Sequence, residues 1–276
     1  MGNTPAKKTP KTVVFADNDV LLLEAIPELL RTKGLDVYPA RDGLEALQAI
    51  RKLKPSYVIL DIVMPKIDGS RVCWLIRQEP NLRDTPIIAF SALGPQDIRR
   101  FPELSADAYV AKGPLGIVVQ NILLAMKYVD DRGRGGFEGG IFGYEGFHPR
   151  KIISEMVLSK RHWEGLMRAF GAGVLELDQD GRILMANAGA SEILGKKEIH
   201  LIAESLPSLF PARDRQVIQE MLNEVKKARL PEEFQMVVSV RSQALSLRFS
   251  SIVEEGECTG IVVTLEPRQL KATAAK

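Results

Sequence analysis

Six polar or charged residues stand at, or directly after, the ends of short apolar runs in the sequence. They are Asp17, Asn18, Asp19, Asp61, Ser91 and Lys112. If these runs pair as parallel strands, their carboxyl ends meet at one edge of a sheet, so the side chains are expected to lie together. Carboxylates that lie close together repel one another unless a cation sits among them, and oxygen ligands with open water positions suit Mg²⁺. The pattern therefore predicts a magnesium site.

The chemistry expected of this site is phosphoryl transfer. A lysine beside the carboxylates adds a second positive charge that can hold a phosphoryl oxygen. With Mg²⁺ and Lys112 neutralising the transferring group, a carboxylate can attack phosphorus. Any one of these residues could be an ordinary polar residue at the start of a loop. Their joint occurrence at four strand ends favours the functional interpretation.

The elements that must position these side chains alternate between strand and helix. The predicted strands are 12–16, 35–40, 57–60, 87–90 and 108–111, and the predicted helices are 19–32, 43–53, 70–78, 96–101 and 115–129. Such alternation is typical of a parallel sheet that is covered on both faces. We expect an α/β fold with a five-stranded, doubly wound, flavodoxin-like sheet. Pro27 lies inside the first helix and should cost it a hydrogen bond or kink it.

A glycine-rich segment follows this α/β pattern. Seven of the sixteen residues in 132–147 are glycine, which makes an ordered helix or strand costly there. We interpret 131–150 as a linker between two domains. Two alternatives remain open: an RNA-binding segment that uses arginine and aromatic residues, and docking onto a domain surface by Phe137, Phe142, Tyr144 and Phe147.

The second half of the chain has a different pattern. Residues 151–170 predict a connecting helix whose apolar spacing fits either a coiled-coil dimer seam or packing on its own domain. Asp180-Gly181 between two apolar runs predicts a hairpin. A helix is expected over 214–228 and strands over 234–240, 244–253 and 260–265. This order indicates an α+β domain with an antiparallel sheet.

The first half resembles the receiver domain of two-component response regulators. The segments that carry the resemblance are VVFADNDVLLLEAI, YVILDIVMPKIDG, IIAFSALG and DAYVAK, and it covers 11–130. The resemblance implies that Asp61 is the phosphoacceptor, phosphorylated by a sensor histidine kinase. It implies that Asp17 and Asn18 hold Mg²⁺ together with Asp61 and the backbone carbonyl of Val63.

Three further roles follow from the same resemblance. Lys112 pairs with the phosphoryl group. Ser91 supplies the hydroxyl that turns toward the phosphoryl group once it arrives. Tyr109 is the aromatic switch that rotates inward when Ser91 moves.

Two departures from the family pattern stand out. The second acid of the metal-binding pair is Asn18, whose amide can still offer an oxygen but removes one negative charge, so Mg²⁺ affinity should fall. Asp19 comes one position late to replace it. Lys112-Gly113-Pro114 stands where receivers have Lys-Pro, and the extra glycine should loosen the turn into the last helix.

The segments GVLELDQDGRILMANAGASEILG and SLPSLFPARDRQVIQEML, with the three strands after them, resemble a PAS domain over 163–267. Two cofactor signatures of PAS domains are missing. Cys258 is misplaced for a covalent link to flavin, and no histidine that could be an axial ligand of haem lies in 214–228. His200 is expected at the surface. The sequence identifies no ligand for this domain. Its apolar interior could be packed core or could enclose a small molecule, with these candidate residues: Val174, Leu184, Ile193, Leu194, Met221 and Phe234.

Composition limits the function classes. The 276 residues suffice for two domains, and 45% apolar residues exclude a wholly disordered chain. Lys and Arg number 37 against 35 Asp and Glu, so nothing draws the chain generally to nucleic acid or an anionic membrane. Two distant cysteines exclude a disulfide framework. No apolar run approaches the roughly 18 residues of a membrane span, and we expect a cytoplasmic protein.

The sequence therefore predicts a response regulator that is not a turnover enzyme. Its expected partners are a sensor histidine kinase and a second copy of the chain in a PAS-mediated homodimer, with no membrane and no nucleic acid. No DNA-binding pattern follows the second domain in this sequence, so we expect the signal to travel by protein association. The alternative is an unphosphorylated pseudo-receiver and PAS scaffold, in which Asn18 has weakened the Mg²⁺ site too far.

Overall fold

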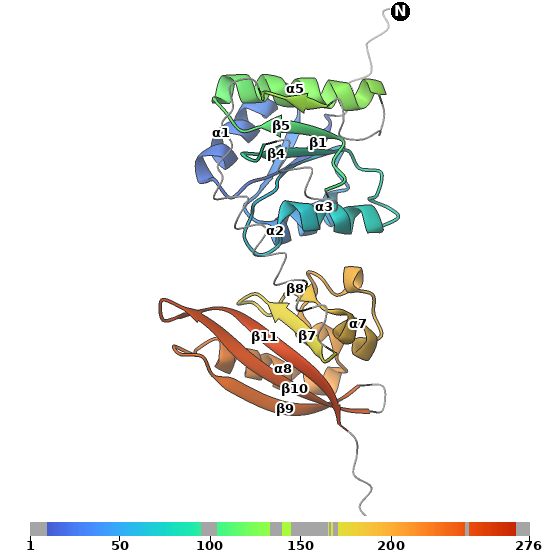
Figure 1. The fold of residues 1–276 in the computed structure, drawn as a ribbon, viewed down its shortest axis with the longest axis vertical. Helices are drawn as coiled ribbons and strands as arrows, with labels where there is room; N and C mark the ends of the chain where they lie inside the picture. Colours follow the sequence, from blue (N-terminus) through green and yellow to red (C-terminus); the bar gives the residue numbers. More distant parts are fainter. Residues whose placement is uncertain are drawn as a thin grey trace, which may run out of the picture. The chain divides into compact units, whose positions relative to one another are not determined.

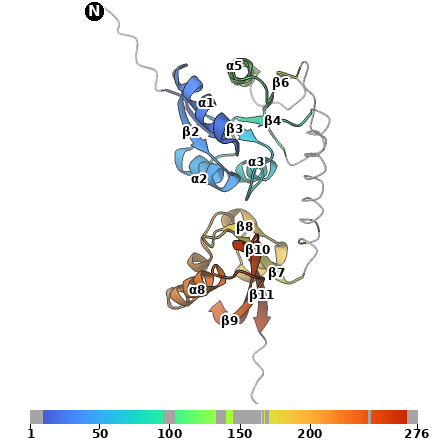
Figure 2. The same cartoon turned by 90° about the vertical axis from the view of Figure 1, so that its left-hand side faces the viewer.

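The computed structural model describes residues 10–94, 104–132, 140–144, 165, 167, 171–240 and 243–268, with the main chain alone at 239–240. The chain divides into two compact units, Met1–Leu158 and Ser159–Lys276, and each is treated by itself (Figure 1, Figure 2). The helix predicted at 96–101 lies outside the described residues. So does the helix predicted at 151–170, except for Gly165 and Met167, which are helical.

The first unit contains one parallel sheet with the strand order β2-β1-β3-β4-β5-β6. Its strands are β1 (Thr12–Ala16), β2 (Asp36–Ala40), β3 (Tyr57–Asp61), β4 (Ile87–Ser91), β5 (Ala108–Ala111) and β6 (Ile141–Phe142). All five predicted strands are present within one residue of their expected bounds. The doubly wound, flavodoxin-like fold is confirmed, but the sheet has a sixth strand that the prediction of five lacked.

Strand β6 comes from the glycine-rich segment. Two apolar residues between glycines are too few to show a strand period, so this strand could not be found by patterning. It pairs in parallel with β5, with Tyr109 opposite Ile141 and Val110 opposite Phe142. Docking onto the domain surface, one of the alternatives for this segment, therefore holds for Phe142. The predicted docking residues Phe137 and Phe147 lie outside the described residues.

Helices cover both faces of this sheet. They are α1 (Val20–Arg31), α2 (Gly43–Leu53), α3 (Gly69–Gln78) and α5 (Leu115–Arg132). Helices α1 and α5 lie on one face, and α2 and α3 on the other (Figure 1). Between the sheet and the first pair, Phe15 and Phe90 pack with ring centroids 5.8 Å apart. Helix α1 runs unbroken through the buried Pro27.

The turn from β3 into α3 is tightly packed. A Cβ on Gly69 would lie 2.0 Å from the carbonyl oxygen of Asp61, and a Cβ on Gly43 would lie 1.7 Å from that of Ile67. The Gly69 amide donates to the Ile62 carbonyl at 2.9 Å, which brings the chain back toward the end of β3. The backbone at Asp61 is thus held by a neighbour that must be glycine.

The second unit contains an antiparallel sheet in the order β8-β7-β11-β10-β9. Its elements are β7 (Gly173–Leu177), β8 (Ile183–Ala186), α7 (Ala188–Leu194), η1 (Glu198–His200), η2 (Leu206–Leu209), α8 (Ala212–Val225), β9 (Glu233–Val240), β10 (Gln243–Glu254) and β11 (Glu257–Arg268). The predicted hairpin joins β7 and β8, and Gly181 in it has a φ of 74°. Asp178 Oδ1 accepts from the amides of Asp180 and Arg182 within this turn. The predicted α+β architecture is confirmed.

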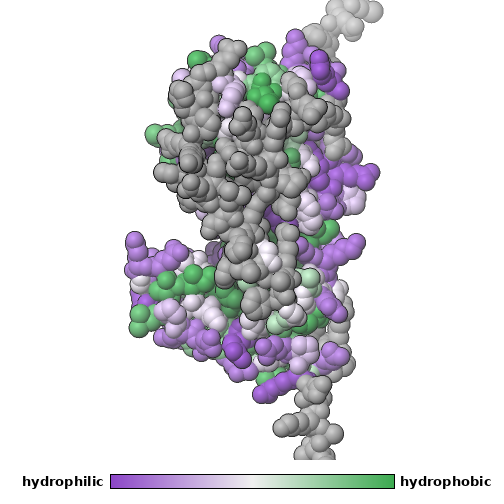
Figure 3. Space-filling view, viewed as in Figure 1, coloured by the Kyte–Doolittle hydropathy of each residue, from purple (hydrophilic) through white to green (hydrophobic). Residues whose placement is uncertain are grey.

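One face of this second sheet packs on its helices. Alternate residues of β10, among them Leu247 and Phe249, are fully buried there. Apolar side chains also reach the surface of this unit, seen as green atoms in Figure 3, and Val237 of β9 is 47% exposed. Of the six candidate interior residues, Val174 and Leu194 are buried and the other four are half-buried.

The contact at Gly69 can be tested directly. Because a new Cβ would collide with the main chain at Asp61, Gly69→Ala should destabilise the first unit by about 3 kcal/mol, the scale of core overpacking. Gly116→Ala is the matched control, since no atom lies within 4 Å of its added Cβ, and its stability should stay level or rise slightly. Calorimetric unfolding of both variants measures the effect. Equal midpoints for the two variants would contradict the packing argument.

Candidate functional site

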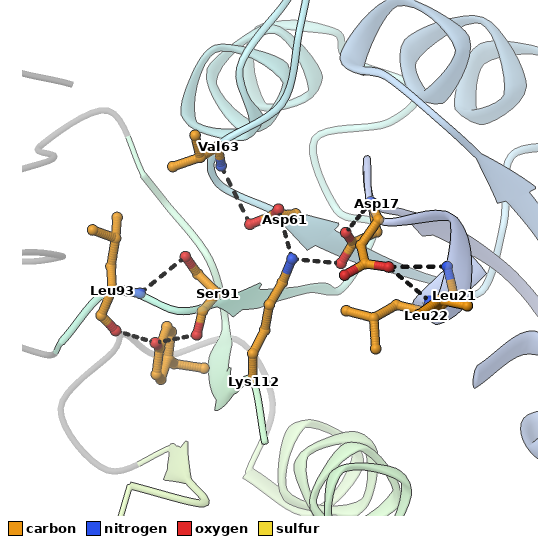
Figure 4. Close-up of polar contacts among 10 residues, drawn as sticks. Asp17, Leu21, Leu22, Asp61, Val63, Ser91, Leu93 and Lys112 are labelled. Atoms are coloured by element: carbon orange, nitrogen blue, oxygen red, sulfur yellow. Dashed lines mark hydrogen bonds and ion pairs between the residues drawn. The ribbon is translucent and has the colours of Figure 1, made fainter. Parts of the chain in front are cut away.

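The carboxyl ends of three strands of the same sheet bring one lysine and two carboxylates together. Asp17 directly follows β1, Asp61 ends β3 and Lys112 directly follows β5. Lys112 Nζ lies 2.7 Å from Asp17 Oδ2 and 2.8 Å from Asp61 Oδ2, so it bridges the two side chains (Figure 4). Asp17 is fully buried and Asp61 is 4% exposed. The arrangement is the one that parallel pairing of the strands predicts.

Burial and charge act against each other at this site. Burial raises the pKa of Asp61 to about 6, the nearby Lys112 charge lowers it, and the Asp17 charge raises it. Burial lowers the pKa of Lys112, but the charges of Asp61 and Asp17 more than offset this and raise it above its ordinary value. The lysine therefore stays cationic at neutral pH. The pKa of the Asp61 carboxyl that faces it lies well above the ordinary value for an aspartate.

Main-chain amides orient the two carboxylates. Asp17 Oδ1 accepts from the Asp19 amide at 2.9 Å, and Asp61 Oδ1 accepts from the Val63 amide at 3.3 Å. The Asp19 side chain accepts from the amides at positions 21 and 22 and so caps α1. This cap gives the Asp19 side chain a role in the start of the helix. Asn18 is exposed.

The oxygen donors at this edge suit a hard cation. Mg²⁺ is held in proteins by one or two carboxylates together with waters and phosphate oxygens, and Asp17 and Asp61 supply two carboxylates. Across the part of the chain that the structure describes, no group of three or more His, Cys, Asp or Glu side chains gathers. The site thus offers Mg²⁺ the two carboxylates of Asp17 and Asp61, one fewer than a site with three acids would.

Ser91 and Tyr109 form a second cluster beside these charges. Ser91 Oγ accepts from the Leu93 amide at 3.2 Å. The Tyr109 hydroxyl bonds to the carbonyl of Ser91 at 2.8 Å and to that of Leu93. Its ring is fully buried, so the structure holds Tyr109 in the inward position. Lys112 Nζ also lies 5.3 Å from the centroid of the Phe90 ring.

Two features of this site were missed by sequence reasoning. One is Gly69. The sequence signal that could have indicated it is a glycine directly after Asp68, the residue that caps the start of α3. The other is the segment 140–144, whose Gly140 carbonyl accepts from the Tyr109 amide at 2.7 Å. Gly113, the extra glycine after Lys112, is not closely packed. The atom nearest to a Cβ added there would be 4.0 Å away.

The described residues of the second unit contain no group of three or more His, Cys, Asp or Glu side chains that could hold a metal ion. His200 is exposed in η1, as expected. Cys258 is buried, and its thiol donates to the Gly260 carbonyl at 3.3 Å. A groove of about 540 Å³ runs past Glu192, Ile193 and Leu245. Among the described residues, no helix is both long enough and apolar enough to cross a bilayer.

Comparison with known proteins divides the chain in the same way. Residues 13–116 match the family model of the response regulator receiver domain, and residues 167–271 match that of the PAS fold. The chain is 29% identical over 104 residues to the polar-differentiation response regulator DivK of Brucella anthropi, a match that covers 37% of this chain and 85% of DivK.

Two further matches cover a similar share of this chain. The DNA-binding dual master transcriptional regulator RpaA of Synechocystis is 31% identical over 101 residues, and the match covers 36% of this chain but only 42% of RpaA. The solved receiver domain of the Francisella response regulator 1452 is 25% identical with a TM-score of 0.38, and the match covers 43% of this chain and 98% of that domain.

Because the pKa of Asp61 is raised, replacing this carboxylate by a neutral amide should increase the stability of the first unit, by an amount that depends on pH. Its folded pKa of about 6 exceeds the ordinary 3.8, so ionisation destabilises the fold as pH rises through 6. In metal-free buffer at pH 8, Asp61→Asn should stabilise the first unit by about 1–3 kcal/mol, and the gain should shrink toward pH 4. Calorimetric unfolding at both pH values checks this.

Asp131→Asn is the control for that experiment, because Asp131 is exposed and its neutralisation should have little effect at either pH. If Asp61→Asn left the unfolding midpoint unchanged at pH 8, the carboxylate would not be held in the unfavourable environment described here.

Proposed function

We propose that this chain, which carries a response regulator receiver domain followed by a PAS domain, accepts a phosphoryl group on Asp61 from a sensor histidine kinase. The observation that supports the proposal best is the contact of Lys112 with two buried carboxylates at the carboxyl edge of the sheet. Once a cation offsets the negative charge of the two carboxylates, Lys112 can exchange a carboxylate oxygen for an oxygen of a phosphoryl group.

The transfer itself needs little from the protein beyond position and charge. An Asp61 carboxylate oxygen forms a bond to phosphorus while the bond from phosphorus to the donor histidine nitrogen breaks, and an acyl phosphate results. Lys112 Nζ, 2.8 Å from Asp61 Oδ2, pairs with a phosphoryl oxygen. Mg²⁺ held at this site would supply further positive charge to the transferring group. Asp17, Asn18, Asp61 and the Val63 carbonyl are the proposed ligands.

Ser91 and Tyr109 are proposed to report the modification. The Ser91 hydroxyl is bonded to the amide of Leu93 and can exchange that partner for a phosphoryl oxygen. Tyr109 bonds to the carbonyls on either side of that turn, so a movement of the Ser91 loop changes what holds Tyr109. Phosphorylation would then bias a two-state surface around this strand.

The output is proposed to be association with another protein chain, in the cytoplasm, without catalytic turnover. The PAS domain is the candidate partner surface, and a PAS-mediated homodimer is supported by the apolar side chains that reach its surface, such as Val237 at 47% exposure. Receiver domains interact with sensor histidine kinases, which makes such a kinase the proposed upstream partner. We assign no role in binding membranes or nucleic acid.

A second candidate is an unphosphorylated scaffold. Asn18 supports it, because the site then holds two carboxylates against one lysine and offers a cation one negative charge fewer than a pair of acids would. In this reading the receiver and PAS domains bind partners, and Asp61 stays unmodified.

Chemical phosphorylation separates the two candidates. Incubation of the full chain with acetyl phosphate and Mg²⁺ should add one phosphoryl group, located on Asp61 by mass spectrometry of its peptides, because the charge of Lys112 and Mg²⁺ stabilises the transferring group. Asp61→Asn should take none, and Asp84→Asn, at an exposed position, should be labelled like the natural chain. An unlabelled natural chain under these conditions would favour the scaffold.

Restoring the acid at position 18 should strengthen metal binding. Asn18→Asp adds a charge beside Asp17, and Mg²⁺ affinity should rise about five- to tenfold, as expected for one more charge near a solvent-exposed cation. Asn81→Asp, at an exposed position elsewhere in the first unit, is the matched control and should leave the affinity unchanged. Isothermal titration with Mg²⁺ measures both, and equal affinities for the two variants would remove Asn18 from the proposed metal site.

A further inference from the structure

The segment 140–144 makes a built contact with the first unit. Its strand β6 pairs with β5, and the Phe142 ring packs edge-on against Tyr128 of α5 with the centroids 5.8 Å apart at 72°. Aromatic pairs of this geometry stabilise beyond the area that they bury. This contact also covers the edge of β5, which would otherwise present unpaired main-chain groups to other chains.

Both glycines that flank this strand fit the surface closely. A Cβ on Gly140 would lie 2.8 Å from the Tyr128 ring. Gly143 has a φ of 75°, and a Cβ there would lie 2.4 Å from Asn121 Nδ2. Glycines that only made the chain flexible would not have to lie so close to neighbouring side chains. Here they allow the backbone to approach α5, which indicates that the segment is adapted to dock.

Tyr109 joins this docked segment to the phosphorylation site. Its amide donates to the Gly140 carbonyl at 2.7 Å, while its hydroxyl bonds to the carbonyls of Ser91 and Leu93. Burial, the charge of Asp61 and the proximity of Tyr144 all raise the pKa of Tyr109. One residue is thus tied through its main chain to 140–144 and through its side chain to the Ser91 loop.

We infer that residues 140–144 are an internal ligand of β5 whose docking is coupled through Tyr109 to the state of Asp61. The inference rests on the proposed function for the phosphoryl step alone. Docked β6 and inward Tyr109 occur together in this structure, and the proposed switch places Tyr109 inward when Ser91 moves toward a phosphoryl group. Phosphorylation therefore tightens the docking of 140–144.

Coupling of this kind is reciprocal. If a phosphoryl group on Asp61 favours the docked segment, then the docked segment must favour the phosphoryl-bound state by the same factor. Undocking the segment should therefore weaken the affinity of the site for a phosphoryl analogue, although residues 140–144 supply no ligand to it. A segment that merely covers the β5 edge would show no such effect.

Hydrogen exchange on the full chain tests the docking without phosphate. Phe142→Ala should speed exchange at the Tyr109 amide about five- to tenfold, the scale of one lost aromatic pair. Tyr109→Phe, which removes the hydroxyl bonds, should also speed exchange over 140–144. Leu124→Ala is the control, because Leu124 is 53% exposed on the same helix, and it should change neither rate. Unchanged exchange over 140–144 in Tyr109→Phe would overturn the inference.

A second measurement adds the phosphoryl analogue beryllofluoride with Mg²⁺. Exchange at the Tyr109 amide should slow several-fold on binding. Phe142→Ala should bind the analogue more weakly, by at most that same factor, and Leu124→Ala should bind like the natural chain. Equal affinity in all three proteins, with an unchanged Tyr109 rate, would overturn the coupling while leaving Asp61 a working acceptor. A natural chain that took up neither the analogue nor a phosphoryl group would instead refute the proposed function.

Discussion

The site depends on one lysine held between two carboxylates that water barely reaches. Removing charges from water is unfavourable unless each finds a partner, and here a single ammonium group serves both Asp17 and Asp61 at 2.7 and 2.8 Å. The three residues come from the ends of β1, β3 and β5. The contact therefore forms only when these strands pair in the observed parallel order, and the fold and the chemistry are specified together.

The balance of charge at this edge is incomplete. Two carboxylates against one lysine leave one negative charge in a buried place, and burial raises the pKa of Asp61, with a smaller contribution from the charge of Asp17. A divalent cation bound by the two carboxylates would offset this negative charge. A phosphoryl group could then bind between Lys112 and the cation. Asn18 adds no charge to this excess, whereas an acid at that position would increase it.

Sequence reasoning located the strands and brought Asp17, Asp61, Ser91 and Lys112 to one edge, because parallel topology fixes where strand ends lie. It could not supply the distances, the inward position of Tyr109 or the contact at Gly69. Each of these depends on packing between segments far apart in the chain. Asp19 shows a related limit: its type suits a metal ligand, but its position makes it the cap of α1, and only the structure shows which role it takes.

The glycine-rich segment shows why composition alone can mislead. Glycine lowers the stability of an isolated strand by increasing the freedom of the unfolded chain, which is why such a segment is first interpreted as a linker. The same absence of a side chain lets a backbone approach another surface more closely than any other residue allows. At Gly140 and Gly143 the second property is the one in use, since a Cβ at either position would overlap α5. A short strand between two such glycines has few contacts of its own, and for that reason we expect a change at Tyr109 to shift its docking.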